Sequence, residues 1–154
     1  MKVHWHTVWQ GHHIAICRDD VEVDRFDAQQ VERVLLLYKG SGDFPGDVVQ
    51  AVVELPEECL VFGAETGFAG RVNFERQAFW AERNCVHWVS QARASLPLRL
   101  RTGLLKLSAP AYARVPKADL AHAIGRWPVQ GPQTWDERKR RRIERAQPFS
   151  FEHA

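Results

Sequence analysis

The order of apolar and polar residues over the first ninety positions predicts β structure. Apolar and polar residues alternate through segment 3–9, which is typical of a half-buried strand. A turn at Gln10-Gly11 followed by a second apolar segment predicts a hairpin. The sequence also predicts strands at 13–18, 21–23, 31–39, 48–55 and 59–64. A helix remains the alternative for 31–39, because its leucine run shows no alternation.

The pattern changes to helical spacing after Asn73. Residues 73–84 predict a helix that closes over the sheet, with Phe74 and Phe79 among its apolar positions. Segment 85–89 is compatible with a strand. For 98–107 the sequence leaves strand and helix open.

Two further helices are predicted in the C-terminal part of the chain. The first covers 117–127, and the connector before it is marked by Pro110 and Pro116. The second covers 134–146. It begins at Thr134 with Glu137 three residues later, the spacing of a capping box, in which each residue's side chain caps a backbone amide of the other.

These elements indicate an α+β fold: a curled antiparallel β-meander or partly open barrel closed by a helix, with C-terminal helices. We expect a β-rich domain over 1–110 and a basic helical extension, 111–154, packed on it. In topology, residues 3–84 resemble a pleckstrin-homology-like domain, although they carry no diagnostic motif. That resemblance implies a binding module rather than an enzyme.

The amino-acid composition indicates a globular protein. The chain has 154 residues, 45% of them hydrophobic, which suits one globular domain with a real core. No apolar run approaches the ~20 residues of a membrane span, and the N-terminus lacks the apolar stretch of a secretory signal. We therefore expect a cytoplasmic protein whose three cysteines, Cys17, Cys59 and Cys85, are reduced and buried.

Charge is distributed very unevenly along the chain. Residues 1–90 carry 8 Lys/Arg and 14 Asp/Glu, a formal charge of −6, whereas residues 91–154 carry 13 and 5, a formal charge of +8. Six basic residues crowd into the last predicted helix: Arg138, Lys139, Arg140, Arg141, Arg142 and Arg145. Such a cluster points to an anionic partner, or to docking on the acidic half of the chain.

Helical spacing predicts how this basic helix is used. Trp135, Ile143 and Ala146 fall near one stripe, which we expect to dock on the body of the domain. Arg138, Arg141 and Arg145 fall on another face, at spacings i, i+3 and i+7, and are expected to point to solvent. Arginine there would suit contact with carboxylates or phosphates.

Histidines and cysteines are the candidates for chemistry. His4 and His6 share a strand face, and His12 and His13 flank the predicted turn, so the four are weak candidates for a metal site. We see no carboxylate within this cluster. A second candidate is a nucleophilic Cys85 with His87 as its base.

Known catalytic motifs are missing from the sequence. The glycine-bearing segment 40–47 lacks the Lys-Ser/Thr ending of a phosphate-binding loop and carries two aspartates. Segment 65–71 lacks the glycine spacing of a dinucleotide site, and no nucleophile-elbow motif occurs. The sequence implies no cofactor and leaves open whether the chain is an enzyme, with the balance against it.

Three functional hypotheses follow. The favoured one is a non-enzymatic module that binds a protein partner, or itself, through the basic helix and Trp135. The second is nucleic-acid binding through phosphate contacts of 138–145. Its weakness is a pI of 8.6, below the strongly basic range of dedicated binding domains. The third is an enzyme that depends on a metal or on a Cys/His pair.

Overall fold

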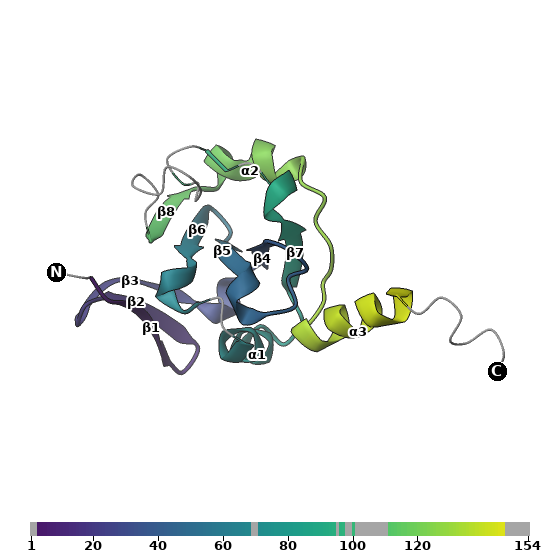
Figure 1. Cartoon of the computed structure of the whole chain (residues 1–154). Helices are drawn as coiled ribbons and strands as arrows, with labels where there is room; N and C mark the ends of the chain where they lie inside the picture. The colour runs from purple at the N-terminus through teal and green to yellow at the C-terminus, as the bar shows by residue number, and fades with distance from the viewer. Residues whose placement is uncertain (1–2, 69–70, 95, 98–99, 101–110, 147–154) are drawn as a thin grey trace.

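The computed structural model describes residues 3–68, 71–94, 96–97, 100 and 111–146. Within these ranges the chain forms an open α+β fold of two sheets with helices around them, the last of which extends outward from the sheets (Figure 1). The strands are β1 (Trp5–Gln10), β2 (His13–Arg18), β3 (Val21–Asp27), β4 (Arg33–Tyr38), β5 (Val48–Glu54), β6 (Glu58–Gly63), β7 (Val86–Ser90) and β8 (Tyr112–Pro116). The helices are α1 (Arg71–Ala81), α2 (Lys117–Gly125) and α3 (Trp135–Ala146).

The strands divide into a three-stranded and a five-stranded sheet. The first has the order β1-β2-β3 and is antiparallel throughout. The second has the order β7-β4-β5-β6-β8, and its neighbours are antiparallel except β4 and β7. The prediction of a purely antiparallel arrangement is wrong at β7. Helix α1 carries the chain from β6 to the far edge, and a connection that contains a helix permits parallel pairing.

The five-stranded sheet is buried on both faces. One face packs against the three-stranded sheet and α1, and the other packs against α2 (Figure 1). In β4, Val34 and Leu36 belong to the first core, whereas Leu35 and Leu37 belong to the second. A strand covered on both sides needs apolar residues at every position, which is why the leucine run lacks alternation.

Two predictions about the second half need correction. The expected connector between Pro110 and Pro116 contains β8, which pairs with β6 as an edge strand, so the extension contributes to the sheet as well as to the helices. The prediction that Phe79 covers the sheet is also wrong, because Phe79 is 71% exposed. Instead, α1 docks with Trp80 and with buried Gln77, whose side-chain amide donates to the carbonyl of Ala28 at 3.0 Å.

The remaining predicted elements agree with the structure to within a few residues. Segment 98–107 lies outside the described residues apart from Leu100, so the choice between strand and helix there stays open. Among the described helices, none is both long enough and apolar enough to cross a membrane.

Candidate functional site

Helix α3 begins at a side-chain cap, as the sequence predicts. The Thr134 hydroxyl accepts a hydrogen bond from the backbone amide of Glu137 at 3.1 Å. Directly before this cap, the connecting segment 130–133 pairs with the edge of β7. Trp88 and Gln130 exchange two backbone hydrogen bonds of 2.8 Å, and the amide of Gln133 donates to the carbonyl of Val86 at 2.9 Å. The start of α3 is therefore fixed to the five-stranded sheet.

This connector approaches β7 very closely at Gly131. The residue has φ +124°, and a Cβ there would lie 3.1 Å from the carbonyl oxygen of Val86 and 3.2 Å from the Cα of His87. Glycine adopts such a backbone without strain and leaves room for the neighbouring strand.

Arg138, at the end of the first turn of α3, also contacts the body of the domain. Its guanidinium carbon lies 4.3 Å from the ring centre of Tyr38 and 4.9 Å from that of Trp88. Nη1 of Arg138 lies 3.6 Å from a carboxylate oxygen of Asp43. Only 6% of Arg138 is exposed. We call Tyr38, Trp88 and Asp43 the arginine slot.

The loop 40–47 gives the arginine slot its shape. Gly42 has φ +75°, and a Cβ at this position would lie 2.8 Å from a ring carbon of Tyr38 and 3.1 Å from Nη1 of Arg138. Only a glycine allows the loop to pass this close to both groups. This glycine-bearing loop thus brings Asp43 to the arginine.

The predicted orientation of α3 is therefore partly wrong. Arg138 was expected in solvent and is buried, whereas Ile143 was expected to dock and is 45% exposed. Trp135 packs edge to face on Trp88, with ring centres 5.4 Å apart, as a docking residue should. The reason is that two aromatic faces and a carboxylate make a better partner for a planar cation than for an aliphatic side chain.

The cations that follow Arg138 point to solvent. Lys139, Arg140 and Arg141 are exposed, and among the described residues no carboxylate lies within ion-pair distance of any of them. We call these three cations and Ile143 the α3 surface. Helix α3 includes Arg142 and Arg145, but their side chains lie outside the described residues.

The four histidines of the first hairpin, weak candidates for one metal site, do not converge. The register places His6 opposite Cys17 and His13 opposite Gln10, so the two pairs lie at opposite ends of the hairpin. At one end, the rings of His4 and His6 stack with their centres 5.3 Å apart.

At the other end of the hairpin, His12 and His13 meet a carboxylate. Asp27 of β3 is the cross-strand neighbour of His13. Nδ1 of His12 lies 2.7 Å from Oδ1 of Asp27, and Nε2 of His13 lies 3.9 Å from Oδ2. Burial alone would raise the pKa of the Asp27 carboxyl, but hydrogen bonds from His12 and the Gln29 amide outweigh it and lower that pKa. Sequence reasoning missed Asp27, because strand pairing across a turn brings it to the histidines.

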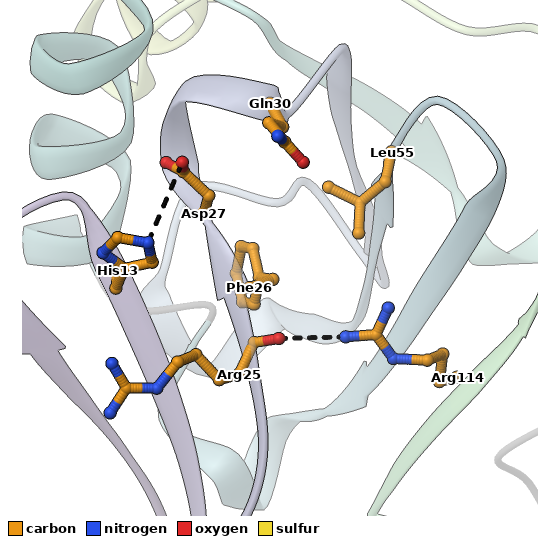
Figure 2. Close-up of a pocket in the computed structure, with 7 residues that line it drawn as sticks. All are labelled: His13, Arg25, Phe26, Asp27, Gln30, Leu55 and Arg114. Atoms are coloured by element: carbon orange, nitrogen blue, oxygen red, sulfur yellow. Dashed lines mark hydrogen bonds and ion pairs between the residues drawn. The ribbon is translucent and has the colours of Figure 1, made fainter.

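A cleft of about 320 Å³ opens beside this cluster. Figure 2 shows His13 and Asp27 on one side of it and Leu55 and Arg114 on the other, with Phe26 between them. Arg25, whose backbone carbonyl faces Arg114, and Gln30 complete the lining (Figure 2). The lining of the cleft therefore combines the apolar Phe26 and Leu55 with charged and polar residues.

Arg114 holds the two sheets together at this cleft. Its guanidinium donates to Asp24 at 2.8 and 3.0 Å, to Glu58 at 2.8 Å and to the backbone carbonyl of Arg25 at 3.0 Å. Tyr112 also donates to Asp24. Burial opposes ionisation of Asp24, yet the hydrogen bonds from Arg114 and Tyr112 prevail and lower the pKa of this carboxyl. These contacts occupy most of the donors of Arg114, which makes it a structural cation.

The candidate pair of Cys85 and His87 is not arranged for nucleophilic chemistry. Cys85 is 1% exposed, and burial raises the pKa of its thiol. Nδ1 of His87 lies 3.1 Å from the backbone carbonyl oxygen of Cys85, and no hydrogen bond joins the imidazole to the thiol. A buried thiol with a raised pKa supplies little thiolate.

Comparison with known proteins found no matching family model, no matching curated protein and no matching solved structure.

Proposed function

We propose that this protein is a non-enzymatic interaction domain that binds an acidic segment of a partner protein on the α3 surface. The observation that carries the proposal is the docking of α3 through buried Arg138, which leaves Lys139, Arg140 and Arg141 exposed. A helix fixed in this way presents its cations with less loss of conformational freedom on binding than a free basic tail.

An acidic protein segment suits the α3 surface better than a nucleic acid does. Ile143 is 45% exposed and lies one turn after Lys139 and Arg140 on the same side of the helix. An apolar residue beside two exposed cations resembles the composition of a protein interface, in which apolar and charged side chains lie side by side. Nucleic acid would use the cations alone. The topological resemblance to pleckstrin-homology-like domains that the sequence indicates for residues 3–84 also favours a binding module over an enzyme.

A peptide-binding experiment tests the proposal. We would measure fluorescence anisotropy of a short labelled peptide in which glutamates flank a leucine, and of single- and double-stranded oligonucleotides, at about 50 and about 200 mM salt. The first variant replaces Lys139, Arg140 and Arg141 with Gln. A control variant with the same change in net charge replaces the exposed cations Arg18, Arg93 and Arg126 with Gln.

The expected result has three parts. The peptide binds the wild type, binding is lost in the α3 variant but kept in the control, and Ile143→Ser weakens it. Oligonucleotide binding that is insensitive to Ile143→Ser, with no peptide binding, would overturn the proposal in favour of nucleic acid. Equal binding by the α3 variant and its control would also overturn it, because charge alone would then explain the affinity.

A further inference from the structure

We propose that His12, His13 and Asp27 form a binding site for a divalent transition-metal ion of the zinc class, with an open coordination position toward the cleft. This site is independent of the α3 surface. Among the described residues, these three are the only group whose potential ligand atoms come together, all within 4.8 Å of one another.

The chemistry of the three side chains fits this class of ion. Two imidazoles with one carboxylate are a common ligand set of catalytic zinc and of non-haem iron. Magnesium and calcium prefer oxygen ligands, so two imidazoles select against them. The two carboxylate oxygens of Asp27 face different histidines, Oδ1 toward His12 and Oδ2 toward His13. An ion between the three groups would take the place of the hydrogen bond that now joins Nδ1 of His12 to Oδ1 of Asp27.

Each of the three side chains is positioned by a different neighbouring element. The ring of His12 packs against Trp80 of α1, with ring centres 5.6 Å apart. His13 is fixed by its place in β2, opposite Asp27. Asp27 accepts a hydrogen bond from the backbone amide of Gln29 at 2.8 Å, which orients its carboxylate. Neighbours of this kind position metal ligands and strengthen binding.

The surroundings leave room for a further ligand on the metal. The three side chains are half-buried, with exposed fractions of 33%, 42% and 21% for His12, His13 and Asp27. His13 and Asp27 also line the cleft (Figure 2). A water molecule or a donor atom of a small ligand in the cleft can therefore complete the coordination, as in zinc sites with three protein ligands.

The experiment uses the full chain, freed of metal by a chelator, and titrates it with Zn²⁺ by calorimetry and with Co²⁺ by visible absorption. Three variants test the ligands: His12→Gln, His13→Gln and Asp27→Asn. The asparagine keeps an oxygen that can accept from the Gln29 amide, so this variant preserves the local turn. The control is the double variant His4→Gln/His6→Gln, which removes the histidine pair at the other end of the same hairpin. Circular dichroism checks that every variant is folded.

We expect the wild type and the control to bind one Zn²⁺ per chain, and the Co²⁺ complex to show the absorption bands of a low-coordinate nitrogen and oxygen site. Each folded ligand variant should lose this binding. The proposal is overturned if the wild type binds no Zn²⁺, if folded Asp27→Asn binds as tightly as the wild type, or if only the His4/His6 variant loses binding. The peptide assay on the α3 surface does not depend on these outcomes.

Discussion

Replacing Arg138 with alanine should weaken the docking of α3 on the body of the domain. The side chain has three attractive partners in the arginine slot: the rings of Tyr38 and Trp88 and the carboxylate of Asp43. A cation over an aromatic ring contributes about 0.5–1 kcal/mol when exposed and about 2 kcal/mol when desolvated. The two rings together therefore contribute about 2–3 kcal/mol, because Arg138 is almost fully buried.

The other terms are smaller and partly cancel. The pair with Asp43, at 3.6 Å, is longer than a hydrogen bond, and because both side chains are buried the cost of desolvation cancels most of the attraction, which leaves about 0.5 kcal/mol. Against this, Nε of Arg138 is buried without a hydrogen-bond acceptor among the described residues, which costs about 1 kcal/mol. The net contribution to docking is about 2 kcal/mol, and losing it shifts the docking equilibrium by about thirtyfold.

Hydrogen exchange measures this effect directly. An undocked helix of 12 residues is marginal in water, so the backbone amides of α3 should exchange about thirtyfold faster in Arg138→Ala. The amides of β4 should keep their protection. Arg138→Lys keeps the charge but loses the flat stacking surface, so it should fall between alanine and the wild type.

Arg140→Ala is the matched control, since it removes the same charge from the same helix at an exposed position. We expect its exchange rates to stay close to those of the wild type. Equal acceleration by Arg138→Ala and Arg140→Ala would refute the reasoning, because net charge rather than the arginine slot would then control docking.

Three further predictions concern stability. In a urea titration, Gly42→Ala should lower the free energy of unfolding by about 2 kcal/mol, because the new side chain meets both a positive φ and a steric clash. Gly40→Ala is the control: this position has φ +58° but open space around it, so the loss should be only about 1 kcal/mol. Arg114→Gln should lower the free energy of unfolding by about 2 kcal/mol, because it leaves Asp24 without its charged donor, and an unchanged urea midpoint would contradict this. Folding lowers the pKa of Asp24 and of Asp27, so their contribution to stability is present above the ordinary carboxyl pKa and is lost as the pH falls below about 4. Asp24→Asn should therefore flatten the acid side of the curve of melting temperature against pH.

Local patterns predicted the individual elements well, and the reason is physical. Alternation in 3–9 and the turn at Gln10-Gly11 indicated the first hairpin, since a sheet with one exposed face imposes a period of two. The Thr134 cap marked the start of α3 correctly, because the contact spans only three residues. Where burial covered both faces, as in β4, the period disappeared and the sequence left helix and strand open.

Long-range contacts produced the errors. The edge strand β8 depends on pairing with β6, which nothing in the segment between Pro110 and Pro116 reveals. Helical spacing predicted that Arg138 points to solvent. The spacing within one helix carries no information on Tyr38, Trp88 and Asp43, which lie far away in the sequence and contact the arginine in the fold.

The sequence by itself determined the α+β class, the β-rich first half, the basic last helix and its cap, all of which depend on composition or on neighbours within a few residues. The tertiary structure alone decided which cation is buried and which are exposed. It also brought Asp27 next to His12 and His13, although no turn signal in the sequence links that carboxylate to the histidines. Charge and periodicity are encoded locally, whereas a site is made by residues that strand pairing and helix docking bring together from distant parts of the chain.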